Sequence, residues 1–207
     1  QSKIPYPIES KEKTVDYRGG NIVNILVIHS HNANRGDEAA AKAMVDELLI
    51  KYPGATITIS NNGFTPYPGM PENVIQIDRF PKLESRMAQL EFFIVLLFKG
   101  KFAFTKEARK FIRALKEADV VLHAPGGPSI GDTYFKAEKL YLWRLNLIRR
   151  MGIPYIFYAP SMGPFNCTSR NKLRKEVISG AERIVLRDPI SVKYVKDFLP
   201  GVEVEQA

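Results

Sequence analysis

The sequence predicts an α/β fold: a doubly wound, mostly parallel, Rossmann-like sheet with helices on both faces. Three observations predict it. Apolar, β-branched segments alternate with amphipathic helical segments from end to end. The first of these segments, 22–28, is almost continuously apolar, which is typical of a strand buried on both faces. Glycine, proline and polar residues gather after the predicted strands, where parallel sheets bind ligands.

In the first half of the chain, turn residues separate the predicted elements. Prolines, paired glycines and many charges predict an irregular lead segment at 1–21. After the strand at 22–28 and a polar turn, alanine and leucine predict a helix at 39–51. Alternating threonine and isoleucine predict a strand at 55–60. This half then continues with a short strand at 73–77, a helix and turn within 83–104, and a helix at 105–117 capped by Thr105.

The second half repeats a simpler unit of strand, polar junction and helix. Its predicted elements are a strand at 119–123, a helix at 134–151, a strand at 154–159, a helix at 168–179 capped by Thr168, a strand at 182–186, a helix from 189 to about 199, and the start of a strand at 202–205. Asp188 before Pro189 predicts an N-cap with proline at the first helical position. We therefore expect residues 22–207 to form one Rossmann-like domain.

Composition bounds the class of protein. The chain has 207 residues, of which 45% are hydrophobic and 25% charged, so a disordered chain is excluded. A single cysteine, Cys167, excludes an internal disulfide and a multi-cysteine zinc site, and three histidines leave few ligands for a metal centre. We therefore predict no metal site and no cofactor. The longest apolar run, 92–98, is far shorter than the roughly 20 residues of a membrane-spanning helix.

The charge balance predicts an acidic partner. Thirty basic and 22 acidic residues give a formal charge of +8, which suits phosphate, an anionic glycan, nucleic acid or a lipid surface. Nucleic acid is the weakest of these, because the aromatic residues fall in apolar runs and do not alternate with basic residues. The segment 92–104, with Lys99 and Lys101, fits either a helix that contacts a membrane surface or a buried helix, and we expect the buried helix.

The junction after the first strand has the residues of an anion or hydroxyl site. Gly36 permits a tight turn into the following helix, whose first N–H groups favour an anion. We expect Asn34, Gly36 and Glu38 to bind substrate and Asp37 to act as a catalytic carboxylate. The alternative is that Asp37 caps its own helix. The segment lacks the G-x-G-x-x-G spacing and the Walker lysine, so a nucleotide-binding fingerprint is not supported.

The glycine-rich junction after the strand at 119–123 provides a second candidate. Gly126 and Gly127 let a ligand approach the backbone closely, and Ser129 offers a hydroxyl. Asp132 is the second candidate catalytic carboxylate, since it can accept hydrogen bonds from sugar hydroxyls or act as a base. The alternative is a tight turn with Asp132 as a helix cap.

Two further junctions add substrate-binding candidates. Ser161 and Gly163 follow the strand at 154–159, and Ser161 does not stand in the G-x-S-x-G elbow of serine hydrolases. Arg170 and Arg174 follow them and can fork onto a phosphate or carboxylate, or lie on a solvated helix face. Arg187 ends the strand at 182–186 and is the better candidate for binding an anion.

The three histidines and the cysteine are weaker candidates. His29, His31 and His123 all lie near the predicted ligand edge. A histidine at a strand end is more often structural than catalytic, so we leave these three out of the predicted site. Cys167 has no neighbour that marks it as a nucleophile.

Taken together, the four junctions resemble those of the polysaccharide pyruvyl transferase family. The residues that carry the resemblance are Asn34-Arg-Gly-Asp-Glu38, Gly126-Gly127 with Asp132, Tyr158-Ala-Pro-Ser-Met-Gly-Pro-Phe165, and Arg187-Asp188 with Ser191. Their order and spacing match across about residues 22–205. The chain departs from the family in having two glycines where three are frequent, and Ala159-Pro160 where the family usually has glycine and glutamine.

The resemblance implies a fold, a reaction and a location. It implies two Rossmann-like halves that face each other across a cleft, as in B-type glycosyltransferases, with this chain as the amino-terminal half and the carboxy-terminal domain missing. It implies transfer of pyruvate from phosphoenolpyruvate to a sugar or lipid-linked glycan as a cyclic ketal, in exopolysaccharide or cell-wall synthesis. It also implies that the enzyme acts in the cytoplasm, where peripheral contact with the inner face of the membrane is open to it. Arg187 is the residue that matches donor binding.

Two alternative functions stay open. A B-type glycosyltransferase that uses a nucleotide sugar would show the same alternation of strands and helices. A non-catalytic anion- or glycan-binding domain would use the same junctions without turnover, and half of a cleft would behave in that way. Release of a nucleotide, of inorganic phosphate or of neither distinguishes the three.

Overall fold

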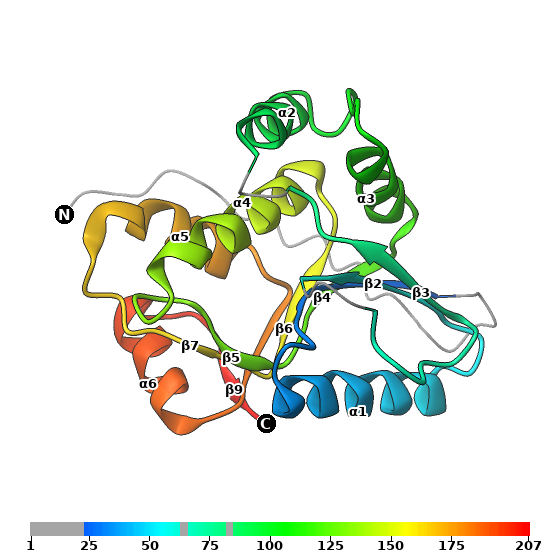
Figure 1. Cartoon of the computed structure of the whole chain (residues 1–207). Helices are drawn as coiled ribbons and strands as arrows, with labels where there is room; N and C mark the ends of the chain where they lie inside the picture. The colour runs from blue at the N-terminus through cyan, green and yellow to red at the C-terminus, as the bar shows by residue number, and fades with distance from the viewer. Residues whose placement is uncertain (1–22, 63–65, 82–84) are drawn as a thin grey trace.

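A computed structural model describes residues 23–62, 66–81 and 85–207 and confirms the predicted α/β class (Figure 1). Its main sheet is parallel throughout, with the strand order β3-β2-β1-β4-β6-β8-β9. The strands of this sheet are β1 (Asn24–Ser30), β2 (Thr56–Asn61), β3 (Val74–Asp78), β4 (Val120–His123), β6 (Tyr155–Tyr158), β8 (Arg183–Leu186) and β9 (Glu205–Gln206). The predicted lead segment at 1–21 lies outside the described residues.

Helices cover both faces of this sheet. They are α1 (Arg35–Lys51), α2 (Arg86–Leu97), α3 (Lys106–Glu117), α4 (Phe135–Met151), α5 (Asn171–Ser179) and α6 (Pro189–Phe198). Figure 1 shows α1 on one side of the sheet and α2, α3 and α4 on the other. Strand β1 explains both layers, because Ile25 and Val27 pack on the α1 side while Leu26 and Ile28 join the core on the opposite side. The strand is therefore buried on both faces, as its apolar run predicts.

Three helix starts follow local capping chemistry. The Thr105 hydroxyl accepts from the backbone N–H of Ala108 at the start of α3, and the Asp188 carboxylate caps α6, so both predicted caps are confirmed. Helix α1 begins at Arg35, four residues before the predicted start, because the Asn34 side chain accepts from the N–H of Gly36. Asp37 therefore lies inside the first turn and is not the cap, which corrects the alternative reading of that residue.

The predicted cap at Thr168 is wrong. Thr168 opens a short 3₁₀ turn, Thr168–Arg170, and α5 begins only at Asn171. Neither the turn nor α5 has a side-chain cap. Arg174 of α5 donates to the Cys167 carbonyl at 2.9 Å, which ties the residue before the 3₁₀ turn to the helix after it.

The glycine- and proline-rich junctions contain strands that local propensity does not predict. Strand β5 (Gly126–Ile130) pairs in parallel with β7 (Pro160–Met162) as a second, two-stranded sheet. Backbone bonds extend the pairing beyond both strands, from Gly163 N to the Ile130 carbonyl at 2.8 Å and from Asp132 N to the Pro164 carbonyl at 2.9 Å. Only this pairing across the fold makes the segments extended. The last strand, β9, also differs, since it is shorter than the predicted one and starts at Glu205.

Gly131 is required where β5 ends against β7. Its φ is +140°, and a Cβ there would lie 2.6 Å from the Gly163 carbonyl oxygen. We expect Gly131→Ala to lower the free energy of unfolding by about 1–3 kcal/mol, because it adds both backbone strain and a clash with backbone. Urea titration measures this. Gly54→Ala is the control, since a Cβ there meets nothing within 4 Å, and a Gly131→Ala variant as stable as this control would contradict the expectation.

The prediction of a buried helix in the segment 92–104 is half correct. Phe92 and Val95 of α2 are fully buried, whereas Leu97, Phe98 and Phe102 are exposed. No helix among the described residues is long and apolar enough to cross a membrane.

Candidate functional site at the switch point of the sheet

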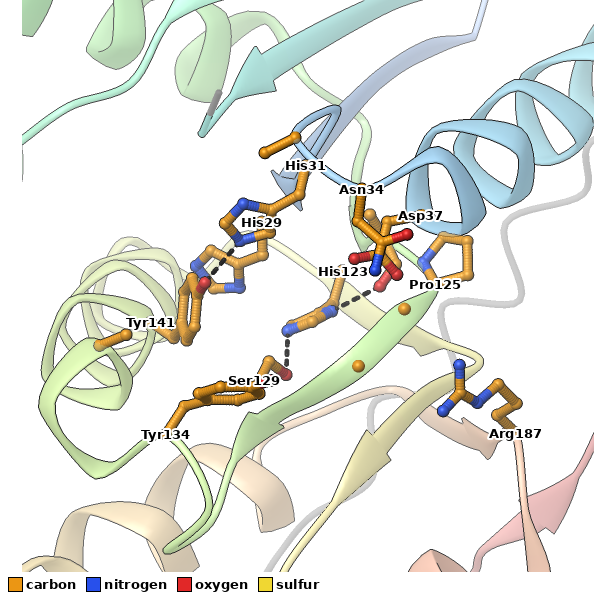
Figure 2. Close-up of a pocket in the computed structure, with 15 residues that line it drawn as sticks. His29, His31, Asn34, Asp37, His123, Pro125, Ser129, Tyr134, Tyr141 and Arg187 are labelled. Carbon is orange, nitrogen blue, oxygen red and sulfur yellow. Dashed lines mark hydrogen bonds between the residues drawn. The ribbon is translucent and has the colours of Figure 1, made fainter. Parts of the chain in front are cut away.

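A pocket lies at the carboxyl ends of β1 and β4, the two central strands of the sheet. From β1 the chain builds the sheet in one direction through β2 and β3, and from β4 it builds in the other. Parallel sheets bind ligands at this switch point, where the crossover helices diverge. The pocket has a volume of about 510 Å³ (Figure 2). Its lining residues are His29, His31, Ala33, Asn34, Asp37, His123, Ala124, Pro125, Gly126, Gly127, Ser129, Tyr134, Ala137, Tyr141 and Arg187.

The start of α1 presents Asp37 to this pocket. Asn34 caps the helix, which places Asp37 in its first turn beside β5. A Cβ at Gly126 would come within 3.0 Å of the Asp37 Oδ1 atom, and Gly126 has a φ of +149°. A side chain at Gly126 would therefore crowd the carboxylate. Among the described residues, none donates a hydrogen bond to Asp37, so both of its oxygens are available to a ligand.

Histidines from the ends of β1 and β4 form the opposite wall. The His123 Nδ1 lies 2.9 Å from the Ala124 carbonyl, which can only accept, so Nδ1 carries the proton. The His123 Nε2 then accepts from the Ser129 hydroxyl at 2.8 Å. Further out, the His31 Nε2 lies 2.6 Å from the Tyr141 hydroxyl. Neither ring nitrogen of the buried His29 has a hydrogen-bond partner among the described residues.

His29 stands out in this wall for a second reason. Its φ is +60°, a left-handed conformation that is unusual for a residue with a side chain. The conformation turns the ring toward His123 and Tyr141, with ring centroids 4.6 Å and 4.4 Å away. His29 lines the pocket, and both of its unpaired nitrogens are buried beneath that lining.

Burial keeps these histidines neutral at pH 7. Burial, with smaller contributions from His123 and Arg144, lowers the pKa of His29 well below its ordinary value, and burial lowers the pKa of His123 to about 4. Burial also lowers the pKa of His31. Among the described residues that line the pocket, Arg187 is therefore the only one with a positive side chain at neutral pH. An anionic ligand has one obvious charged partner there.

The buried His123 makes stability depend on pH. The folded state keeps His123 neutral down to about pH 4, whereas the unfolded chain protonates it below about 6.5. The unfolded state therefore binds more protons between these values, and the stabilising contribution is complete above pH 6.5 and lost as the pH falls toward 4. We expect a loss of about 2 kcal/mol from this residue between pH 7 and pH 4.5, measured by urea titration at the two pH values. The slope should be smaller in His123→Asn, and an unchanged slope would contradict this assignment.

The structure brings half of the sequence-predicted site residues to the pocket. Those that line it are Asn34, Asp37, Gly126, Gly127, Ser129 and Arg187. Gly36 and Glu38 belong to the first turn of α1 but do not line the pocket. Ser161 donates to the Asp188 carboxylate at 2.8 Å, and Gly163 has a φ of +86° and packs beneath Tyr194. These four residues shape the junctions around the pocket.

Asp132 and Arg170 lie in a separate, partly buried network. The Asp132 carboxylate accepts from the Arg174 guanidinium at 2.8 Å and from the Cys167 N–H at 2.9 Å, and these partners lower the pKa of Asp132. The carboxylate of Glu138 joins Arg174 at 2.7 Å and Arg170 at 3.0 Å. Arg174 is fully buried, which corrects the view of it as part of a solvated helix face.

Sequence reasoning left out the histidines and two tyrosines. Tyr134 and Tyr141 come from the start and middle of α4, where helical periodicity gives no sign of a pocket. The signal for His29 and His123 was present, because both end strands that are neighbours in the sheet. Among the described residues, no group of three or more His, Cys, Asp or Glu side chains is placed to hold a metal ion.

A parallel sheet in this order, with a pocket at its switch point, defines a doubly wound α/β protein of the Rossmann-like class. The chain belongs to the polysaccharide pyruvyl transferase family, whose model matches residues 34–206. That match contains all four junctions described above.

Two solved structures match the chain at low identity. One is described as "Molecular Engineering of Organophosphate Hydrolysis Activity from a Weak Promiscuous Lactonase Template", and another as "Y97L/G100-/E101- mutant in organophosphorus hydrolase". Each is 13% identical with a TM-score of 0.31 and covers 88% of this chain. This chain spans 65% and 62% of their lengths, less than two thirds of either. No curated protein matches the chain.

Proposed function

We propose that the protein transfers pyruvate from phosphoenolpyruvate to two hydroxyls of a sugar, which forms a cyclic ketal and releases phosphate. The acceptor is an exopolysaccharide or cell-wall glycan, or its lipid-linked precursor. Family membership supports the reaction class. The observation that carries the proposal is a single pocket that combines the open carboxylate of Asp37 with the guanidinium of Arg187.

Arg187 suits the donor. Phosphoenolpyruvate carries a phosphate and a carboxylate, and a guanidinium binds such groups with paired hydrogen bonds. Arg187 follows β8 and reaches the pocket from the end opposite His29 and Tyr141 (Figure 2). The neutral histidines add hydrogen-bonding groups without further charge. Gly126 and Gly127 leave room for substrate against the backbone between these groups.

Asp37 suits the acceptor. The methylene carbon of phosphoenolpyruvate gains a proton, which makes its neighbouring carbon electrophilic, and a sugar hydroxyl adds there as it loses its proton. The second hydroxyl then replaces phosphate at the same carbon, so two hydroxyl protons are released, one balanced by the new methyl group and one by phosphate. A carboxylate that is free of other partners can accept such a proton. We assign this role to Asp37.

We also propose a setting for this reaction. A second Rossmann-like domain completes the cleft, and the enzyme works in the cytoplasm at the inner face of the membrane. The domain described here then binds substrates but does not turn them over alone. Turnover by this chain without any further domain would contradict that part of the proposal.

The test is incubation of the full-length enzyme with phosphoenolpyruvate and a panel of sugars, followed by phosphate release and product mass. Acceptor-dependent phosphate release, with a product heavier by one ketal-linked pyruvate, supports the proposal. Turnover of a nucleotide sugar instead would replace it by the glycosyltransferase alternative. Binding of the anion or glycan without turnover would leave a non-catalytic domain.

Arg187→Met should weaken use of the donor. We expect KM for phosphoenolpyruvate to rise by about tenfold or more, since one bond to a charged group contributes about 1.5–3 kcal/mol. Steady-state kinetics with varied phosphoenolpyruvate measure this. Arg183→Met, at the start of the strand that Arg187 follows, is the control, because Arg183 pairs with Glu205 on the surface. Equal KM values for the two variants would contradict the assignment.

A further inference from the structure

Helix α2 and the turn after it expose an unusual amount of apolar surface. Twelve large hydrophobic side chains are exposed among the described residues, and seven of them fall within 87–104. These seven are Met87, Leu90, Phe93, Leu97, Phe98, Phe102 and Phe104. Figure 1 shows α2 at the outer edge of the molecule, on the side of the sheet opposite α1. Apolar residues concentrated in this way mark an interaction surface.

The exposed stripe is not needed to hold α2 in place. Met87, Leu90 and Leu97 recur at helical spacing and share one face of α2. The opposite face holds Phe92 and Val95, which are fully buried in the core. The core therefore anchors the helix, while the outward stripe remains available for another surface.

A basic hollow adjoins the stripe. The turn and α3 enclose about 400 Å³, lined by Gly100, Lys101, Ala103, Arg109, Ile112, Arg113, Lys116 and Glu117. Arg113 pairs with Glu117 at 2.9 Å, whereas Lys101 and Lys116 form no ion pair with any described residue. Nearby Glu91 is buried and accepts from the N–H groups of Phe104 and Thr105, and it forms no ion pair with either lysine.

We propose that the α2–α3 face, defined by these seven apolar residues and the basic hollow, docks on an anionic lipid bilayer. The apolar stripe enters the headgroup region, and Lys101, Arg109 and Lys116 meet lipid phosphates. The charge selects this occupant, because a second copy of the face would place like charges against one another. A lipid surface instead supplies both an apolar layer and negative charge.

Membrane docking does not depend on the proposed reaction, so each can fail without the other. If both hold, docking brings the pocket to an acceptor carried on lipid. The binding assay below uses no phosphoenolpyruvate and no sugar, so its outcome reports the surface alone.

The experiment is co-sedimentation of the full chain with vesicles of phosphatidylcholine alone or with added phosphatidylglycerol. We expect binding to the anionic vesicles, with less binding as salt rises. The double variant Met87→Asp/Leu97→Asp should bind about tenfold more weakly or worse, since it removes two inserting side chains. The control is the double variant Ile190→Asp/Ile50→Asp, whose residues match in exposure and position. Met87 (73% exposed) and Ile190 (63%) are each the second residue of a helix. Leu97 (65%) and Ile50 (74%) each lie at or next to the last residue of a helix.

A second variant keeps the test decisive if the first one unfolds. Lys101→Glu/Lys116→Glu leaves the apolar stripe intact, and it should lose on the order of tenfold or more of its anionic-vesicle binding. Lys51→Glu/Lys196→Glu, on helices outside the face, should bind like the wild type. Wild-type protein that ignores anionic vesicles overturns the proposal. The proposal is also overturned if the wild type binds no vesicles, runs as a dimer in gel filtration, and becomes a monomer in the Met87→Asp/Leu97→Asp variant.

Discussion

Replacing Glu138 by alanine is expected to lower the free energy of unfolding by about 3–5 kcal/mol. Glu138 is fully buried on α4, and its carboxylate accepts from the Gly131 N–H at 2.8 Å and from Arg174 at 2.7 Å and 3.0 Å. Alanine would leave the buried guanidinium of Arg174 with Asp132 as its remaining carboxylate. An uncompensated buried charge costs far more than a lost surface pair. Thermal and urea unfolding measure the loss.

The control for this prediction is Glu117→Ala. Glu117 pairs with Arg113 on the surface of α3, where both side chains are mostly exposed, so we expect a change of at most about 0.5 kcal/mol. The double variant Glu138→Met/Arg174→Met should recover part of the stability, because apolar side chains of similar size replace both charges. If Glu138→Ala and Glu117→Ala had the same free energy of unfolding, the network would not stabilise the fold.

The same network supports the candidate site. Glu138 holds the N–H of Gly131, the residue that ends β5, while β5 provides Gly126, Gly127 and Ser129 to the pocket. Helix α4 carries Glu138 and also Tyr141, which bonds to His31. The buried ion pair therefore fixes β5 and the helix that carries Tyr141, and its loss should loosen both sides of the pocket.

The strands of the main sheet follow from local patterns, whereas those of the second sheet do not. The run at 22–28 predicts a doubly buried strand because its side chains feed two cores, as Ile25 and Leu26 do in the structure. Strands β5 and β7 escape prediction because glycine and proline have low strand propensity. Their extended form depends on backbone bonds between residues about 30 positions apart, such as Gly163 N to Ile130 O.

The candidate site divides in the same way. Asn34, Asp37 and Arg187 were predictable because each follows a strand of the main sheet and local sequence fixes where that strand ends. Asp37 and Asp132 look alike in the sequence, since both follow a glycine after a strand. What separates them is Arg174, 42 residues beyond Asp132, which takes up that carboxylate. The orphaned nitrogens of His29 likewise depend on burial, which spacing along the chain does not reveal.

Asp37→Asn is expected to lower kcat by about 10²–10⁴-fold in the full-length enzyme, because an amide keeps the shape of the carboxylate but cannot take a proton. KM for phosphoenolpyruvate should change little, since the proposal assigns donor binding to Arg187. Steady-state phosphate release with a saturating acceptor measures both constants. The comparison with Arg187→Met then separates the two roles. Asp37→Asn should lower kcat, whereas Arg187→Met should raise KM for phosphoenolpyruvate.

Glu38→Gln is the matched control for the helix terminus. It removes the same charge from the same turn of α1, but Glu38 does not line the pocket. Both variants lose the favourable interaction with the helix dipole, about 0.3–1 kcal/mol of stability, so only a difference in kcat reports catalysis. Asp132→Asn should lose stability and keep most of its kcat, because its carboxylate is already bound to Arg174. If Asp132→Asn instead lost turnover while Asp37→Asn kept it, the base would lie beside Arg174 and the pocket at the switch point would serve binding alone.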